Sequence, residues 1–176
     1  HTTNKTMPVI TEKAKTLVVA MIAGLGLSAC SSIDCPLNNR TYASFKLAGD
    51  VTKLVDTLTI STPRNIDNPE EDTVLINRLV DTDSLSLPMS YQRTEDIYIF
   101  TFVQKDTELK TIDTLWVSKE NEPHFESVDC NPVMFHTIKD VRFTQRAIDS
   151  IKVNYNKVTY NDAKAHFLIY LKNRGN

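Results

Sequence analysis

The segment IYIFTFV, residues Ile97–Val103, is apolar or aromatic on both of the faces that alternate along an extended chain. The segment AHFLIYL, residues Ala165–Leu171, has the same character near the end of the chain. Strands that read this way are covered on both faces, because a strand with one wet face alternates apolar and polar residues instead. Both segments are therefore predicted to be central strands that are buried from both sides.

Alternation continues on either side of these two segments, and the chain after Cys30 shows almost no helical period. In YASFKL, residues 42–47, three apolar side chains share one face and more polar side chains share the other. In VMFHTIKDVRF, residues 133–143, the large apolar side chains mostly keep one parity. The first segment is predicted to be a half-buried strand. The second is predicted to be one long strand, or two strands that meet at Lys139-Asp140.

A five-residue pattern of Asp, Ser or Thr, and then apolar-any-apolar recurs at irregular spacing. It begins at Asp56, Asp72, Asp83, Asp113 and Asp149. Aspartate favours turns and disfavours strands, and a period-2 apolar pair points to one face of a strand. The pattern therefore predicts five strand beginnings, each with an outward-facing hydroxyl. Those hydroxyls belong to Thr57, Thr73, Ser84, Thr114 and Ser150.

Turn signals and prolines separate about eight or nine such runs, as in an all-β domain. The fold class predicted is all-β, a single antiparallel β-sandwich over residues 40–176, either immunoglobulin-like or transthyretin-like. A small closed barrel is the alternative.

The composition excludes some classes of function. The chain has 176 residues, 41% of them hydrophobic, and a formal net charge of −2. This length suits one domain, and the charge provides no broad positive field to attract nucleic acid. Only Gly49 and Gly175 lie beyond the leader described next, which argues against a glycine-rich phosphate loop. We expect no nucleic-acid partner and no cofactor.

The N-terminal segment has the three parts of a secretory signal peptide. Lys13 and Lys15 precede an apolar run over residues 17–27, and small residues follow it. The run is shorter than the roughly 20 residues that a membrane-spanning helix needs. Residues 1–29 are therefore predicted to be a signal peptide. Because the sequence begins at His1, Met7 is the expected start, with residues 1–6 as an artefact of gene calling.

The end of this leader, Leu27-Ser28-Ala29-Cys30, resembles the lipobox of bacterial lipoproteins. The resemblance implies a diacylglycerol on the sulfur of Cys30, cleavage before Cys30, and a tether over residues 30–39. Several acyl chains make a stable membrane anchor. An ordinary signal peptide with an incidental Cys30 is the alternative. Neither the aspartate that signals inner-membrane retention nor an acidic surface-export cluster follows Cys30, so the expected location is the periplasmic face of the outer membrane.

Two cysteines, Cys35 and Cys130, remain after lipidation of Cys30. An even pair in an oxidising compartment predicts a disulfide, here one that closes a long loop. The alternative is a metal site that also recruits His124 and His136, but those spacings match no zinc pattern. We expect a disulfide and no metal.

The sequence contains no serine elbow, zinc-peptidase motif or phosphate loop, so no catalytic residue is assigned and we expect a protein without enzymatic activity. His124 beside Glu122 and Glu126 is the candidate base of a hydrolase, with a solvated strand histidine as the alternative. The run from Glu70 to Asp72 is a candidate calcium ligand set, or simply a solvated loop.

Trp116 has an outward parity in DTLWV, residues 113–117. An exposed tryptophan on a sheet stacks on sugar rings or anchors a protein interface. Packing under a loop is the alternative. With Tyr91 and Tyr98, Trp116 would form the stacking platforms of a glycan-binding module.

The five Asp-Ser/Thr-apolar triplets also resemble the acceptor motif of the general O-glycosylation system of Bacteroidota. The resemblance implies modification of one or two of the five hydroxyls named above, and Thr57 and Thr114 are the first to check.

Four further segments carry a resemblance that covers essentially the whole mature chain. They are Asp34-Cys35-Pro36, Asp56-Thr57-Leu58, PHFESVDC at residues 123–130 and AHFLIY at residues 165–170. Together they resemble an uncharacterised lipoprotein family of Bacteroidota that carries a domain of unknown function. The resemblance implies no activity. It supports only lipidation at Cys30 and the pairing of Cys35 with Cys130.

The function expected from these features is that of a non-enzymatic outer-membrane lipoprotein. It would face the periplasm, bind the membrane through Cys30, and act as an accessory or assembly partner of another envelope protein, for example an outer-membrane barrel. Exposed strand edges would suit addition of a partner's strand. A surface-exposed glycan-binding module is the alternative.

Overall fold

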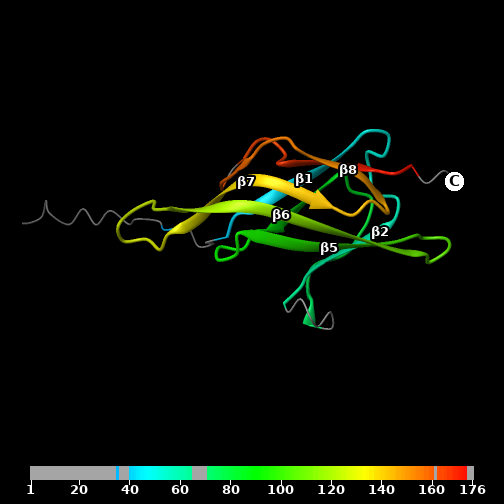
Figure 1. Cartoon of the computed structure of the whole chain (residues 1–176), viewed down its shortest axis with the longest axis horizontal. Helices are drawn as coiled ribbons and strands as arrows, with labels where there is room; N and C mark the ends of the chain where they lie inside the picture. The colour runs from blue at the N-terminus through cyan, green and yellow to red at the C-terminus, as the bar shows by residue number, and fades with distance from the viewer. Residues whose placement is uncertain (1–34, 36–39, 65–70, 161, 174–176) are drawn as a thin grey trace, which may run out of the picture. The chain divides into compact units, whose positions relative to one another are not determined.

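The structure is a computed structural model that describes residue 35 and residues 40–64, 71–160 and 162–173. Within these residues the chain forms ten strands and no α-helix (Figure 1). They are β1 (Tyr42–Ala48), β2 (Thr57–Thr62), β3 (Thr73–Leu79), β4 (Ser84–Pro88), β5 (Glu95–Val103), β6 (Lys110–His124), β7 (Val133–Phe143), β8 (Ile148–Val153), β9 (Lys157–Val158) and β10 (Phe167–Leu171). The predicted signal peptide and Cys30 lie outside the described residues.

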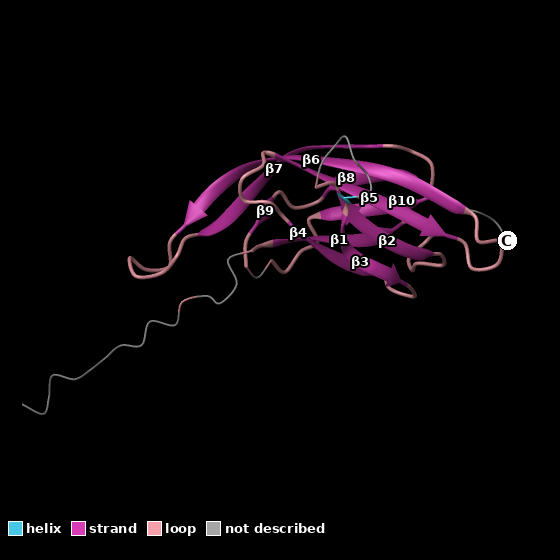
Figure 2. Cartoon of the chain, turned by 90° about the horizontal axis from the view of Figure 1, so that it is seen from below, coloured by secondary structure: helices cyan, strands magenta, loops and turns pink. Residues whose placement is uncertain are grey.

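The strands form two sheets that pack as a sandwich, which confirms the predicted fold class. One sheet has the order β4-β1-β10-β8, and the other has the order β3-β2-β5-β6-β7-β9. Every strand pairing in the described residues is antiparallel except β1 with β10, which run parallel in the register Phe45↔Phe167. Figure 2 shows the long β6 and β7 running side by side.

The core lies between the two sheets and centres on aromatic rings. Phe45 of the four-stranded sheet stacks on Phe167 at 4.6 Å between ring centroids. Phe45 also packs nearly perpendicular to Tyr98 and to Phe100 of the other sheet, with the ring centroids 6.4 Å apart in each pair. Offset and edge-on arrangements at these distances favour aromatic packing beyond the area they bury. The alternation predicted for β1 is confirmed, because Ala43, Phe45 and Leu47 are all buried.

The prediction that residues 97–103 and 165–171 are buried from both sides is only half right. In β5 the inward residues Tyr98, Phe100 and Phe102 are buried, whereas Ile97, Ile99 and the other outward residues are half-buried. β10 follows the same pattern over its five residues. A sandwich covers one face of each sheet, so apolar outward side chains are shielded only by their neighbours in the sheet.

The Asp-Ser/Thr pattern marks a strand beginning in three of its five places. β2, β3 and β4 begin at Thr57, Thr73 and Ser84, each directly after the aspartate. The other two predictions are wrong, because Asp113 is the fourth residue of β6 and Asp149 the second of β8. The segment 133–143 is one strand, and its pairing with β6 shifts register between Ser118 and Lys119. That shift leaves Lys139 of β7 as a bulge.

Asp113 has a structural role that differs from the predicted turn. Asp113 is fully buried, and its carboxylate accepts hydrogen bonds from the segment between β7 and β8. The Thr144 hydroxyl donates to Asp113 Oδ1 at 2.7 Å and the Arg146 N–H donates to the same oxygen at 2.8 Å. The N–H groups of Ala147 and Ile148 donate to Oδ2 at 2.7 and 2.9 Å. Asp113 thus fastens the crossing from the six-stranded sheet to the four-stranded one.

These contacts decide the protonation of Asp113. Burial by itself raises the pKa of a carboxyl group, but the hydrogen bonds from Thr144 and the three N–H groups outweigh it, and the pKa of Asp113 is lowered from 3.8. A carboxylate whose pKa is lower in the folded than in the unfolded chain stabilises the fold at any pH above its unfolded pKa. That stabilisation is lost as the pH falls through the folded pKa.

We expect Asp113→Asn to lower the free energy of unfolding by about 3 kcal/mol at pH 7, because the new amide turns a donor toward two buried N–H donors. The difference from the unsubstituted protein should shrink as the pH falls below 3.8. Urea denaturation at pH 7 and at acidic pH measures both effects. Asp140→Asn, on exposed β7 surface, is the control and should change little. Equal loss in the two variants contradicts the assigned role.

Candidate functional site

The outer face of the six-stranded sheet carries Trp116, the predicted ligand-stacking residue. Trp116 pairs across the sheet with Ile97 of β5 and Arg142 of β7, so the three side chains form one row. Trp116 is half-buried and points away from the core, which confirms its outward parity. In Figure 1, β5, β6 and β7 cross in front of β1, with this outer face toward the viewer.

Two contacts hold the row in place. The Arg142 guanidinium lies 5.3 Å from the centre of the Trp116 ring, a cation–π geometry. The same guanidinium donates to Glu95 Oε2 at 2.9 Å, and the Ser118 hydroxyl donates to that oxygen at 3.0 Å. The hydrogen bond from Arg142, followed by that from Ser118, lowers the pKa of Glu95. The surface thus combines an aromatic and an aliphatic side chain with an ion pair.

The predicted glycan platform is not assembled. Tyr98 is 2% exposed, and its hydroxyl donates to the Pro88 carbonyl at 2.9 Å, so its assignment to a stacking surface is wrong. The cause is parity, because Tyr98 alternates with the outward Ile97 and Ile99. Tyr91 is exposed, with the Arg40 guanidinium 5.8 Å from its ring, but it lies in the loop after β4 and outside the Trp116 row.

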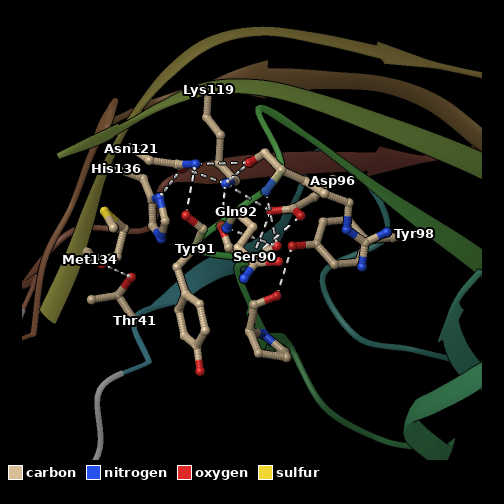
Figure 3. Close-up of polar contacts among 12 residues, drawn as sticks. Thr41, Ser90, Tyr91, Gln92, Asp96, Tyr98, Lys119, Asn121, Met134 and His136 are labelled. Carbon is tan, nitrogen blue, oxygen red and sulfur yellow. Dashed lines mark hydrogen bonds and ion pairs between the residues drawn. The ribbon is translucent and has the colours of Figure 1, made fainter. Parts of the chain in front are cut away.

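A buried polar cluster at one end of the core was not predicted (Figure 3). Its centre is Lys119 of β6, whose side chain has no exposed surface. The ammonium group donates to the carbonyl oxygens of Ser90 and Arg93, the latter at 2.6 Å. It also donates to Asn121 Oδ1 at 2.7 Å and lies 3.6 Å from Asp96 Oδ2. The cluster holds the loop that carries the chain from β4 in one sheet to β5 in the other.

Burial is the main cause of the pKa shifts of Lys119 and Asp96. Desolvation lowers the pKa of Lys119 and raises that of Asp96, and the attraction between the two charges opposes each shift. The Asp96 carboxylate also accepts the Ser90 N–H, at 3.2 Å to Oδ2. The three N–H donors of the Lys119 ammonium group have three acceptors, the Ser90 and Arg93 carbonyls and Asn121 Oδ1. A buried charge is tolerated when its hydrogen-bonding groups are paired in this way. The signal was available in the sequence, since Lys119 has the same parity as Leu115 and Val117.

His136 completes the cluster and is neutral. Asn121 donates through its amide nitrogen to the carbonyls of Tyr91 and Arg93, so its Oδ1 faces His136 Nδ1 at 2.8 Å. Nδ1 must then carry the proton, and Nε2 is left as a buried acceptor without a partner. Burial, and secondly the charge of Lys119, lowers the pKa of His136 to about 4.

This histidine should make the protein sensitive to acid. A histidine whose pKa falls from 6.5 in the unfolded chain to about 4 in the fold binds its proton more readily when unfolded. Stability is therefore lost as the pH drops through that interval, by up to about 3 kcal/mol. We expect His136→Gln to flatten this part of the curve of unfolding free energy against pH. His124→Gln, at a 41% exposed side chain, is the control. Identical slopes in both variants contradict the prediction.

A second buried histidine, His166, lies between a serine and an aspartate. Its Nδ1 is 2.9 Å from Ser44 Oγ, and its Nε2 is 3.0 Å from Asp162 Oδ2. These are the residue types of a nucleophilic triad. However, the backbone N–H of Ser44 also donates to Nδ1 at 2.9 Å, which occupies the lone pair that a base would use. Nε2 also lies 3.0 Å from the Lys157 carbonyl. We interpret this set as a clamp that holds the start of β10 against β1.

The candidate base at His124 is only partly assembled. His124 Nε2 lies 3.2 Å from Glu126 Oε1, and the ring stacks on Phe135 at 4.3 Å. Glu122 is not part of this group, because it accepts from Lys157 Nζ at 2.9 Å and from the Thr137 hydroxyl. Of the calcium candidates, Glu70 lies outside the described residues. Among the described residues, no group of three acidic, histidine or cysteine side chains is placed to hold a metal ion.

A hollow of about 540 Å³ opens at the end of the sandwich near the β5–β6 turn. Its floor includes Leu54, Phe102 and Leu171, and these three residues also line a small void within the core. Its rim carries both signs of charge. Lys105 pairs with Asp81 at 3.7 Å and Lys172 donates to the Gln145 carbonyl at 2.7 Å. The volume suits a small ligand.

The predicted disulfide is present. Cys35 and Cys130 are joined, with their Cα atoms 5.5 Å apart. Of the five hydroxyls predicted as acceptors for O-glycosylation, those of Thr73 and Ser84 belong to exposed residues, whereas Thr57, Thr114 and Ser150 are half-buried. Modification remains a prediction, and exposure favours Thr73 and Ser84 over Thr57 and Thr114. No helix of the described residues is long and apolar enough to cross a membrane.

The described residues define a two-sheet, mostly antiparallel β-sandwich with a disulfide between Cys35 and Cys130. Residues 57–171 match the family of unknown function DUF6452, and the chain belongs to that family. The matched range begins with β2 and ends with β10, so Cys35 and β1 precede it. Comparison with curated proteins and with solved structures gave no match.

Proposed function

We propose that the protein is a non-enzymatic lipoprotein of the outer membrane that faces the periplasm and binds another envelope protein as an accessory or assembly partner. An outer-membrane barrel protein is the partner that suits this location. The observation that carries the proposal is the open face around Trp116, where an ordered row of apolar and charged side chains lies outside the core.

Location is supported by two features. The disulfide between Cys35 and Cys130 suits an oxidising compartment such as the periplasm. The lipobox-like sequence at residues 27–30 supports a lipid on Cys30. A protein held on a membrane surface meets other proteins of that membrane at a raised effective concentration, so even a modest interface is sufficient for binding.

The residue types of the open face support a protein partner. Tryptophan and arginine are enriched among the residues that carry most of the energy of protein interfaces. Here Arg142 is already oriented by Glu95 and Trp116, so less side-chain entropy is lost when a partner docks. Apolar Ile97 on one side and the polar Ser118 and Asp140 nearby resemble an interface core with a polar rim.

The edges of the six-stranded sheet support a partner less well than this face does. β3 forms one edge of the six-stranded sheet, but its pairing with β2 shifts register twice, and Arg78 within it has a φ of 53°. At the other edge β9 is only two residues long. Irregular and very short edge strands discourage the addition of a further strand. The proposed contact is therefore the face, in place of the edge expected from the sequence.

The test is cross-linking in cells with a photoreactive side chain at position 97, followed by capture from detergent-solubilised membranes and mass spectrometry. We expect one stoichiometric envelope protein, and its recovery should fall strongly in Trp116→Ser. The matched control is Tyr170→Ser on the outer face of the other sheet, where Lys152 lies 5.1 Å from the Tyr170 ring. Thermal melts establish that both variants are folded.

Loss of the partner in both variants, or in neither, contradicts the proposed surface. Cross-links only to glycan, together with binding of the purified protein to a glycan array that Trp116→Ser abolishes, would replace this function with the glycan-binding alternative.

A further inference from the structure

The turn between β6 and β7 carries two exposed apolar side chains that the proposed function leaves unexplained. In FESVD, residues 125–129, Phe125 is 62% exposed and Val128 is 98% exposed. Val128 has the largest exposed fraction among the large apolar residues of the described chain. We call residues 125–129 the β6–β7 tip. Apolar side chains exposed together on one turn are candidates for contact with a protein or a membrane.

The tip is held in a defined conformation. The Cys130 N–H donates to the Ser127 carbonyl at 3.2 Å, and the Asp129 N–H donates to the Ser127 hydroxyl at 3.4 Å. The disulfide to Cys35 fixes the residue that follows the tip. Phe125 and Val128 are thus exposed on an ordered turn.

The disulfide also limits how far the tip can lie from Cys30. Cys35 is the fifth residue after Cys30, and a chain of that length spans at most about 18 Å. Val128 lies two residues from Cys130, which adds at most about 8 Å between their Cα atoms. The opposite end of the sandwich is about 50 Å from the tip, because β6 between them has 15 residues. Figures 1 and 2 show the β6–β7 turn and the β5–β6 turn at opposite ends of β6.

We propose that the β6–β7 tip rests on the lipid surface and that Phe125 and Val128 enter the boundary between headgroups and acyl chains. This inference rests on the proposed lipidation of Cys30. The lipid anchor supplies the affinity, and the tip supplies a second contact that sets the orientation of the sandwich. Amphipathic elements with a few large apolar side chains bind membranes in this manner.

The charges around the tip are compatible with a shallow position. Glu126 points its carboxylate toward His124, 3.2 Å away, and Asp129 is exposed. Carboxylates at these positions would remain at the level of the headgroups while the two apolar side chains reach deeper. They also predict weaker contact with a strongly anionic membrane than with a zwitterionic one, because like charges repel.

The test uses the full lipidated protein in vesicles of phosphatidylethanolamine and phosphatidylglycerol whose acyl chains carry bromine, a contact quencher of tryptophan. Trp116 is the single tryptophan of the chain and is replaced in both variants by Trp116→Phe. One variant adds Phe125→Trp. The matched control adds Val55→Trp, at a residue of nearly equal exposure, 63%, beside the hollow at the far end. We expect the emission at position 125 to shift to the blue and to be largely quenched, and the emission at position 55 to be unaffected.

Mass spectrometry of the same samples separates the two ways in which the test can fail. If Cys30 is acylated and the emission at position 125 is not quenched, or is quenched no more than at position 55, the tip does not reach the lipid and this inference is overturned while the anchor stands. If Cys30 carries no lipid, the proposed anchor fails and the inference fails with it. Val128→Trp in the same background provides a second reading at the tip.

Discussion

The inward face of β6 carries two buried charged residues, Asp113 and Lys119, with apolar residues between them. The arrangement of the two sheets depends on these two groups. Asp113 accepts hydrogen bonds from the segment between β7 and β8, and Lys119 donates hydrogen bonds to the loop between β4 and β5. Both segments cross from one sheet to the other. The apolar core between Asp113 and Lys119 brings the sheets together without direction, whereas hydrogen bonds to buried charges require one geometry. His166 has the same role for the crossing from β9 to β10.

Residue alternation was sufficient to predict the sandwich and most of its core. The inward positions of β1 and the outward position of Trp116 follow from parity alone. The buried polar groups were not found, because hydrophobic patterning recognises an inward face only by its apolar residues. Lys119 and Asp113 lie at inward positions of the same strand, but their acceptors and donors come from loops about 30 residues away in sequence. Without the topology, those partners cannot be named.

The candidate sites show the same division between local and long-range information. Pairing of Cys35 with Cys130 needed only a count of cysteines and a compartment, and it was found. The Trp116 row needed the registers of three strands, which no single segment specifies. Tyr98 was assigned to a surface although its neighbours Ile97 and Ile99 carry the outward parity, so strict alternation would have corrected it. Exposure of the β6–β7 tip depends on the length of β6 relative to its neighbours, and the sequence leaves that length open.

The parallel pairing of β1 with β10 has a consequence for how the protein is made. β1 is the inner strand between β4 and β10, and Ser44 reaches its partner His166 across 122 residues of chain. The four-stranded sheet therefore cannot close until β10 is available, and contacts between residues so distant in sequence form slowly. Until β10 pairs with it, the edge of β1 is open and Phe45 lacks its stacking partner Phe167, so the incompletely folded chain exposes the surfaces through which proteins aggregate.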